Sequence, residues 1–173
     1  MSASSVPLNV YLETSIVAAA IIGGSAHSQA SRDVCAALSH ANSTVYFSRL
    51  VRIEVLQILK KYATKDLATP QVREAFRLDQ FSRNLIIRQR WLDFGIQQLD
   101  VLIRTFYRAY ELPIQGQTCQ RCMKIMSQHN LDSYDAIHVA TAMHNNVRDF
   151  VTVDGDFTRV GELKVILVRD PTP

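Results

Sequence analysis

The sequence LNVYLETSIVAAAII, residues 8–22, contains the pattern that decides the fold. Its first five residues are a short apolar run of strand length, in which Val and Tyr favour a strand. The string ETS (13–15) follows at once, and the stretch after it has helical character. Residues 26–40 then favour a helix, and residues 44–47 (TVYF) favour a second strand. Strands that alternate with helices are typical of an α/β domain with a mostly parallel sheet and helices on both faces.

The rest of the chain continues this alternation. Ser48 is placed to cap a helix that runs to about residue 61, and Pro70 to open a long helix that runs to about residue 95. Residues 99–106 are either a third strand or further helix, because their periodicity fits both. The last third is predicted to contain two helices, residues 115–129 and 132–145, followed by two strands, residues 150–153 and 164–168.

The composition is that of a folded domain. Of the 173 residues, 47% are hydrophobic and 20% are charged, and these fractions exclude wholesale disorder. A chain of this length hides roughly 70% of the surface that its unfolded form exposes. No repeat or linker divides the sequence, so we expect one domain over residues 1–173, with residues 1–7 as a loose terminus.

Three features favour the cytoplasm and no membrane partner. No Lys or Arg occurs before Arg32, so the start lacks the positive region of a secretory signal. The apolar run at residues 16–22 is far shorter than the ~20 residues that span a bilayer. The three cysteines are an odd number and do not make a disulfide framework.

Two predicted strands end in acidic residues. Glu13 follows residues 8–12, and Asp154 follows residues 150–153. Ligands of open parallel sheets bind outside the carboxyl ends of the strands, which lie at one edge. We therefore expect Glu13 and Asp154 to meet across a crevice. The alternative is that Asp154 belongs to an ordinary turn, since Asp-Gly is a turn signal.

Glu54 lies on the apolar face of a predicted helix. It projects between Leu50 and Ile58, inside the apolar arc. Burying a lone carboxylate costs several kcal/mol unless it is paired, protonated or bound to a metal. Glu54 is therefore a candidate metal ligand, and an ion pair with an Arg from elsewhere is the structural alternative.

Asp135 begins the string DAIHVATA (135–142) and borders the packed face of a helix rich in small apolar residues. The structural alternative is that Asp132 caps this helix and that Asp135 interacts with its positive N-terminus. Together, however, acids at two strand ends and on two inward helix faces would repel one another in a crevice. A divalent cation would relieve that repulsion, and carboxylate ligands favour Mg²⁺ or Mn²⁺ over zinc. Two such ions about 4 Å apart are the usual arrangement for attack on a phosphodiester.

The sequence resembles the PIN-domain nucleases, and it is most similar to the VapC-type toxins of type II toxin–antitoxin systems. The resemblance spans about residues 8–168. Four features carry it, which are in order YLETS (11–15), Glu54 on an early helix, DAIHVATA (135–142) and TVDGDF (152–157). The last two of these features are the most specific.

The resemblance implies a three-layer α/β/α PIN-like fold and a metal-dependent endoribonuclease that hydrolyses RNA phosphodiesters with a metal-activated water. It also implies an antitoxin protein as partner and a homodimer. The residues that it carries over are Glu13, Glu54, Asp135 and Asp154 as catalytic residues and ligands of Mg²⁺ or Mn²⁺, Asp156 as a further ligand, and Ser15 and Thr152 as residues that orient the acids. The family usually has Asp where this chain has Glu13, and this difference bears on metal affinity and rate.

Other functions remain open beside this one. A catalytically weakened PIN-like module would bind RNA or a protein chain instead of cleaving. A phosphatase of the haloacid-dehalogenase kind also has acids at strand ends, but it needs Asp at the positions of Glu13 and Ser15. A zinc site at Cys119 and Cys122 would need a second pair of ligands, which we do not find in the sequence.

Basic and aromatic residues occur together between residues 83 and 108. Their guanidinium groups would bind RNA phosphates, and their aromatic rings would stack on bases. The alternative, which we favour, is an amphipathic helix with a solvated face, or a contact with an antitoxin or a second copy. The residues are Arg83, Arg88, Arg90, Arg104 and Arg108, with Trp91, Phe94, Phe106 and Tyr107.

Overall fold

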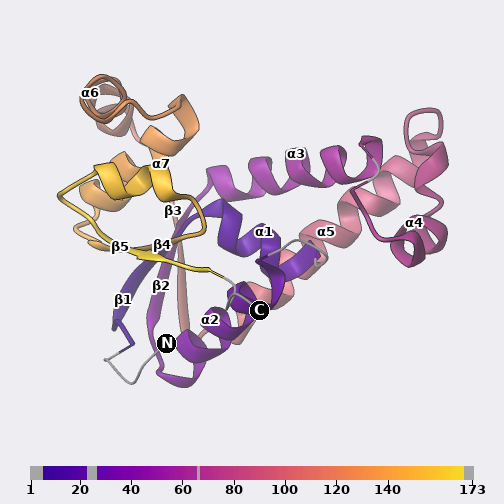
Figure 1. The fold of residues 1–173 in the computed structure, drawn as a ribbon, viewed down its shortest axis with the longest axis horizontal. Helices are drawn as coiled ribbons and strands as arrows, with labels where there is room; N and C mark the ends of the chain where they lie inside the picture. Colours follow the sequence, from indigo (N-terminus) through magenta and orange to yellow (C-terminus); the bar gives the residue numbers. More distant parts are fainter. Residues whose placement is uncertain (1–5, 23–26, 66, 170–173) are drawn as a thin grey trace.

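The computed structural model describes residues 6–22, 27–65 and 67–169, and a five-stranded parallel sheet lies at its centre (Figure 1). The strand order is β3-β2-β1-β4-β5, so the first strand of the chain lies in the middle. The predicted α/β class with a mostly parallel sheet is confirmed. The strands are β1 (Asn9–Leu12), β2 (Thr44–Ser48), β3 (Arg108–Leu112), β4 (Asp149–Thr152) and β5 (Lys164–Leu167).

The pairing of β1 brings together strands that are far apart in the sequence. Tyr11 pairs with Tyr46 of β2 on one side and with Phe150 of β4 on the other. Directly after β1, the backbone N–H of Glu13 donates to the carbonyl of Val151 at 3.1 Å. The carboxyl ends of β1 and β4 therefore lie side by side, as the sequence pattern predicts.

Side chains of β1 alternate between two cores, because successive strand residues point to opposite faces of a sheet. Val10 and Leu12 belong to one core and Tyr11 to the other, and all three are almost fully buried. This is the three-layer α/β/α arrangement that the resemblance implies. The helices of the first core are α1 (Thr14–Ile22), α2 (Ser28–His40), α3 (Leu50–Thr64) and α5 (Leu85–Thr105), and those of the second are α6 (Gly116–His129) and α7 (Ser133–His144).

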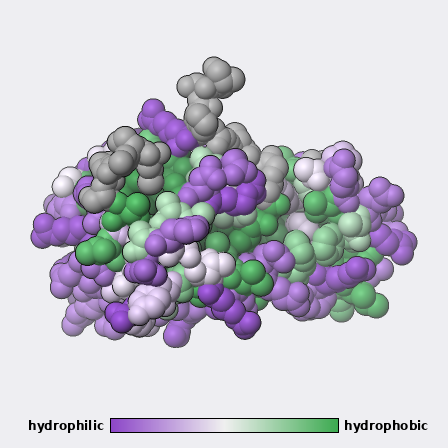
Figure 2. All heavy atoms as spheres, turned by 90° about the horizontal axis from the view of Figure 1, so that it is seen from below, coloured by the Kyte–Doolittle hydropathy of each residue, from purple (hydrophilic) through white to green (hydrophobic). Residues whose placement is uncertain are grey.

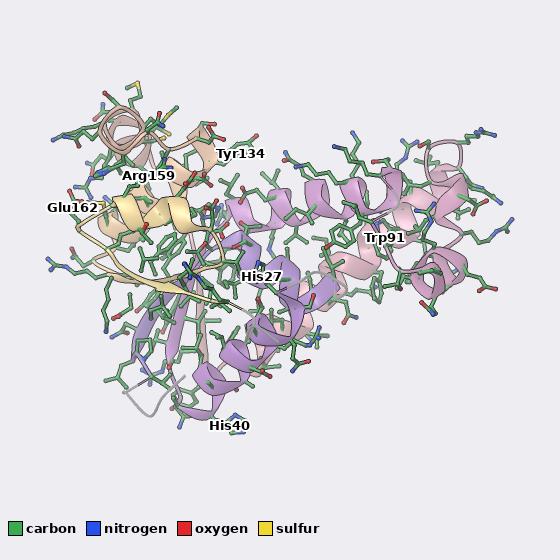
Figure 3. The ribbon with its side chains drawn as sticks, in the orientation of Figure 1. His27, His40, Trp91, Tyr134, Arg159 and Glu162 are labelled. Atoms are coloured by element: carbon green, nitrogen blue, oxygen red, sulfur yellow. The ribbon has the colours of Figure 1, made fainter. Side chains whose placement is uncertain are left out.

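Helices α3 and α5 extend beyond the sheet as an arm, with α4 (Pro70–Phe76) and the short 3-10 helix η1 (Leu78–Gln80) at its outer end (Figure 1). Gly95 allows the two long helices to approach closely, since a Cβ there would lie 2.0 Å from Cδ1 of Leu59. Trp91 lies in the same arm (Figure 3), where its Nε1 donates to the Leu59 carbonyl at 2.9 Å. On the molecular surface, apolar residues lie among hydrophilic ones over both the sheet part and the arm (Figure 2).

The prediction of one continuous helix from Pro70 to about residue 95 is wrong, because the segment contains two helices with a break between them. Helix α4 ends before Arg77, which adopts the left-handed conformation with a φ of 54°. A new helix, α5, begins after Asn84, whose side chain accepts hydrogen bonds from two backbone N–H groups of the first turn. Helix α5 continues to Thr105. Residues 99–106, for which the sequence allowed either a strand or a helix, are therefore helical except for the last residue.

The third strand, β3, lies at residues 108–112, outside every strand that the sequence predicts. It is an edge strand, and because it contains the charged residues Arg108 and Glu111, it does not form the apolar run by which strands are predicted. Ser48 also differs from its prediction, because α3 begins at Leu50 with Arg49 at the N-cap. Ser48 is the last residue of β2, although its hydroxyl still accepts a hydrogen bond from the Leu50 N–H at 3.0 Å.

The other predicted elements agree with the observed ones within a few residues. Residues 1–5 of the predicted loose terminus, and residue 26 of the predicted second helix, lie outside the described residues. Among the helices that the structure describes, none has the length and apolar character needed to cross a bilayer.

Candidate active site at the carboxyl edge of the sheet

Glu13 is a buried carboxylate held in place by its neighbours. Its side chain follows β1 directly, and the residue is only 6% exposed. One oxygen, Oε2, accepts hydrogen bonds from the Ser15 backbone N–H and from Thr152 Oγ1, each at 3.0 Å, and also from Ser15 Oγ. Burial raises the pKa of Glu13, while His138, Ser15 and Thr152 oppose that rise. Ser15 and Thr152 thus form hydrogen bonds with one of the acids that the resemblance expects them to orient.

The shifted pKa of Asp135 indicates that acidic side chains of the site lie close together. It lies in the first turn of α7, and its pKa is raised to about 6. Burial is the largest cause, and the negative charges of Glu13 and Asp154 come next, with His138 opposing them. The three acids, from positions 13, 135 and 154, therefore lie within electrostatic reach of one another. Asp132 occupies the N-cap position of α7, but its side chain makes no capping hydrogen bond.

Asp154 lies at the turn after β4 and is exposed. Its Oδ1 accepts a hydrogen bond from the Asp156 N–H at 2.8 Å and thereby caps the 3-10 helix η2 (Gly155–Arg159). The turn interpretation is therefore correct, and the same residue also acts on the pKa of Asp135. Asp156 is paired with Arg159 at 2.7 Å on the surface, so its proposed role as a ligand would require this ion pair to open.

Glu54 is mostly buried, since its side chain is 14% exposed. Its Oε2 accepts a hydrogen bond from Thr14 Oγ1 at 2.5 Å and lies 2.6 Å from Nε2 of His138. The alternative of an ion pair with an arginine is therefore wrong, because the partner is a histidine. Through His138, Glu54 is connected to the edge at which the other acids lie.

Two residues of this network, His138 and Tyr11, were not among the predicted site residues. His138 is fully buried, as a packed residue of its helix should be, and its Nδ1 lies 2.8 Å from the Tyr11 hydroxyl. Tyr11 is also fully buried in the central strand. The available signal was the position of His138, three residues after Asp135 on a helix of small apolar residues, where a polar ring needs a partner.

The acidic side chains of the site offer carboxylate oxygens, which are the ligands that Mg²⁺ and Mn²⁺ prefer. The raised pKa of Asp135 reflects crowded negative charge, which a divalent cation would relieve. The side chains do not already form a coordination sphere: among the described residues, no group of three or more His, Cys, Asp or Glu side chains could hold a metal ion as they stand. The predicted convergence is thus supported for Glu13, Asp135 and Asp154, whereas Glu54 is engaged with His138.

The aromatic residues of the basic stretch are largely unavailable for base stacking. Trp91 and Phe106 are buried, and Phe94 packs against both Trp91 and Phe76. Tyr107 is exposed, with the guanidinium of Arg108 5.2 Å from its ring centroid. The amphipathic-helix interpretation of this stretch therefore fits better than an aromatic platform for RNA.

The fold and this edge define a class of protein: a three-layer α/β/α domain with acids from β1, α7 and the turn after β4 at the carboxyl ends of parallel strands. The PIN-domain family profile matches residues 10–163, and the chain belongs to the PIN-domain family. No curated protein is a significant match in sequence.

Several solved structures resemble the chain in fold, and two of them are described here. One is VapBC2 from Rickettsia felis, bound to a DNA fragment from its promoter, with 16% identity and a TM-score of 0.58. The other is the VapC20 toxin of Mycobacterium tuberculosis, described as cleaving the sarcin-ricin loop, with 16% identity and a TM-score of 0.60. Each match covers 92% of this chain and 98% of the other.

Proposed function

We propose that this PIN-domain protein is a metal-dependent endoribonuclease and the toxin of a toxin–antitoxin pair. The observation that carries the proposal is the raised pKa of Asp135, which burial and the charges of Glu13 and Asp154 produce together. Three acids that are far apart in sequence share one electrostatic field, at the edge where parallel sheets bind their ligands. Clustered negative charge of this kind is typical of sites that perform chemistry with a divalent cation.

In this proposal Glu13, Glu54, Asp135 and Asp154 hold Mg²⁺ or Mn²⁺, with Asp156 as a further ligand. When bound, the cation supplies the positive charge that activates a water and stabilises the leaving oxygen of the phosphodiester. The chain's own contribution is orientation: Ser15 and Thr152 fix Oε2 of Glu13, and Thr14 and His138 fix Oε2 of Glu54. No protein nucleophile takes part.

RNA is the proposed substrate and the cytoplasm the proposed location, with an antitoxin protein and a second copy of the chain as partners. An RNA hairpin is the suitable first substrate, because one structural relative is described as a sarcin-ricin loop cleaving toxin. The whole chain, residues 1–173, is proposed to act as one domain.

The test is Asp135→Asn, with purified protein, Mg²⁺ and a labelled RNA hairpin. We expect cleavage to fall by orders of magnitude while the circular dichroism spectrum stays unchanged. Asp93→Asn is the matched control, because Asp93 is an exposed acid of the arm that bonds to Gln89. If the Asp135 variant cleaves as fast as the wild type, the proposed function is wrong.

The second candidate is a PIN-like module that binds RNA or a protein chain without cleaving it. It is favoured by the lack of a ready coordination sphere among the described side chains and by Glu13 in place of the usual Asp. A titration with Mn²⁺, followed by thermal unfolding, separates the two candidates. A metal site raises the melting temperature in a concentration-dependent way, whereas a lost site gives no shift.

A further inference from the structure

Tyr134 lies in the first turn of α7, next to the acidic edge (Figure 3). It directly precedes Asp135, so the Cα atoms of the two residues are about 3.8 Å apart. Four residues further along the helix is His138, whose Nε2 lies 2.6 Å from Oε2 of Glu54. Because residues four apart on a helix share a face, Tyr134 lies on the face of α7 that points to Glu54, one turn nearer the start of the helix.

Tyr134 is the exposed end of a helix face that is otherwise buried. His138 and Thr141, which continue this face, are fully buried, whereas Tyr134 is 44% exposed. Side chains on a helix lean toward its N-terminus, and the start of α7 lies at the acidic edge, since it carries Asp135. The ring of Tyr134 therefore borders the open side of the acidic site.

Among the exposed aromatic residues that the structure describes, Tyr134 differs from the others in having no partner for its ring. Tyr110 stacks on Tyr46, with ring centroids 5.5 Å apart. The ring centroid of Tyr107 lies 5.2 Å from the guanidinium of Arg108. Within the described residues, the ring of Tyr134 has no such contact, its hydroxyl has no hydrogen-bond partner, and it belongs to neither hydrophobic core. An aromatic face is thus available to a ligand at this edge.

We propose that Tyr134 stacks on a nucleobase of the RNA and thereby holds the adjacent phosphate at the acidic edge. The inference rests on the proposed function, in which RNA is the substrate. The acids of the edge repel RNA phosphates, whereas the stacking of a base on an aromatic ring is not opposed by that charge. Every base has a π-face, so this contact adds affinity with little dependence on sequence. Tyr134 is a substrate-binding residue, because it contacts a base and not the reacting atoms.

Substitutions of Tyr134 test this contact in the binding of a labelled RNA hairpin, measured by fluorescence anisotropy with Mg²⁺ in the Asp135→Asn background. We expect Tyr134→Ala to raise the Kd about 5–150-fold, since alanine removes the stacking contact. Tyr134→Phe should stay within about threefold of the parent, because it retains the ring. Tyr107→Ala is the matched control and should leave the Kd unchanged. Tyr107 is more exposed, at 64%, but it precedes β3 and therefore lies at the opposite, amino edge of the parallel sheet.

A modified base locates the contact within the RNA. 2-Aminopurine, whose fluorescence is quenched by stacking, is placed at each loop position of the hairpin in turn. We expect quenching on binding at the position that meets Tyr134, retained in Tyr134→Phe and lost in Tyr134→Ala. An abasic nucleotide at that position should weaken binding to the parent but not weaken it further in Tyr134→Ala, because both changes remove the same contact. An unchanged Kd for Tyr134→Ala, equal losses for alanine and phenylalanine, or losses that add to that of the abasic nucleotide would overturn the inference.

Metal binding and cleavage separate this inference from the proposed function. In the otherwise unchanged protein, Tyr134→Ala should leave the Mn²⁺-dependent thermal shift as in the wild type and should raise KM, while kcat stays within about threefold. If the wild type binds the hairpin through Tyr134 but neither binds Mn²⁺ nor cleaves RNA, the proposed function fails and the base contact stands. If the wild type cleaves RNA and Tyr134→Ala has the same Kd and KM, the base contact alone fails. A wild type that binds no RNA overturns both.

Discussion

Nε2 of His138 lies 2.6 Å from Oε2 of Glu54, although 84 residues separate the two in the sequence. The contact joins α7 to α3, and the histidine side chain is fully buried while that of Glu54 is 14% exposed. The position of this carboxylate is therefore set by the interior of the domain. Glu13 is set in a similar way by Ser15 and Thr152. Rigid support of this kind is what a site needs to hold its ligands within a fraction of an ångström.

The raised pKa of Asp135 predicts how stability depends on pH in the absence of metal. A carboxyl group whose pKa rises from 3.8 to about 6 on folding binds its proton more tightly in the folded state. Its contribution to the free energy of unfolding is therefore present at low pH and is lost as the pH rises through 6. Glu13, whose pKa is also raised, acts in the same direction.

Asp135→Asn should therefore stabilise the metal-free protein at pH 7 relative to pH 5. Solvent screening of the half-exposed carboxylate limits the gain to about 1 kcal/mol. Urea unfolding in EDTA at both pH values measures it, with Asp93→Asn as the control for loss of a charge. A variant less stable than the wild type at pH 7 would contradict the crowding of negative charge at this edge.

Glu13→Asp restores the residue that PIN domains usually have at this position, yet we expect it to reduce cleavage. Oε2 of Glu13 already has donors from Ser15 and Thr152 at hydrogen-bond distance. Shortening the side chain by one methylene moves the carboxylate by about 1 Å and breaks part of this arrangement. We expect kcat to fall about tenfold, since displacements of this size loosen a catalytic site.

Single-turnover cleavage of the RNA hairpin measures this effect, and Glu74→Asp is the control, because Glu74 is an exposed glutamate of α4. A variant that cleaves faster than the wild type would show that the hydrogen bonds of Glu13 hold it in a suboptimal place.

Gly95→Ala should destabilise the arm. The added Cβ would lie 2.0 Å from Cδ1 of the buried Leu59, and overpacking of this kind costs about 1–3 kcal/mol. The higher helix propensity of alanine offsets up to about 1 kcal/mol of that cost. Gly116→Ala in α6 is the control, because its Cβ would meet no atom within 4 Å. Chemical denaturation compares the two, and an unchanged or raised stability for Gly95→Ala would contradict the close contact.

Much of the fold could be predicted because its strands are short apolar runs that alternate with helices. The convergence of Glu13 and Asp154 was also predictable, since carboxyl ends of neighbouring parallel strands lie at one edge. The edge strand β3 was missed because it contains the exposed Arg108 and Glu111, which is paired with Arg52, at an edge of the sheet where a continuous apolar pattern is not required. The break between α4 and α5 was missed because Arg77 is not a residue type that signals a left-handed turn.

The Tyr11–His138–Glu54 network could not be predicted from spacing. It joins three elements, and its members become neighbours only through packing of α3 and α7 around the sheet. A histidine on a helix of small apolar residues is compatible with a simple packed role, so its sequence position alone does not reveal two specific hydrogen bonds. For Glu54, the burial argument was sound, but the identity of its partner depended on tertiary structure.

The central place of β1 has a consequence for protein synthesis. Its neighbour β4 begins at Asp149, so β1 stays unpaired on that side until about 140 further residues have been made and β4 has left the ribosome. Asp135 and Asp154 are also translated long after Glu13. A nascent or prematurely terminated chain that ends before β4 therefore lacks an assembled acidic edge, and the nuclease proposed here would be inert towards the messenger and ribosome that produce it until β4 and the turn after it have been made.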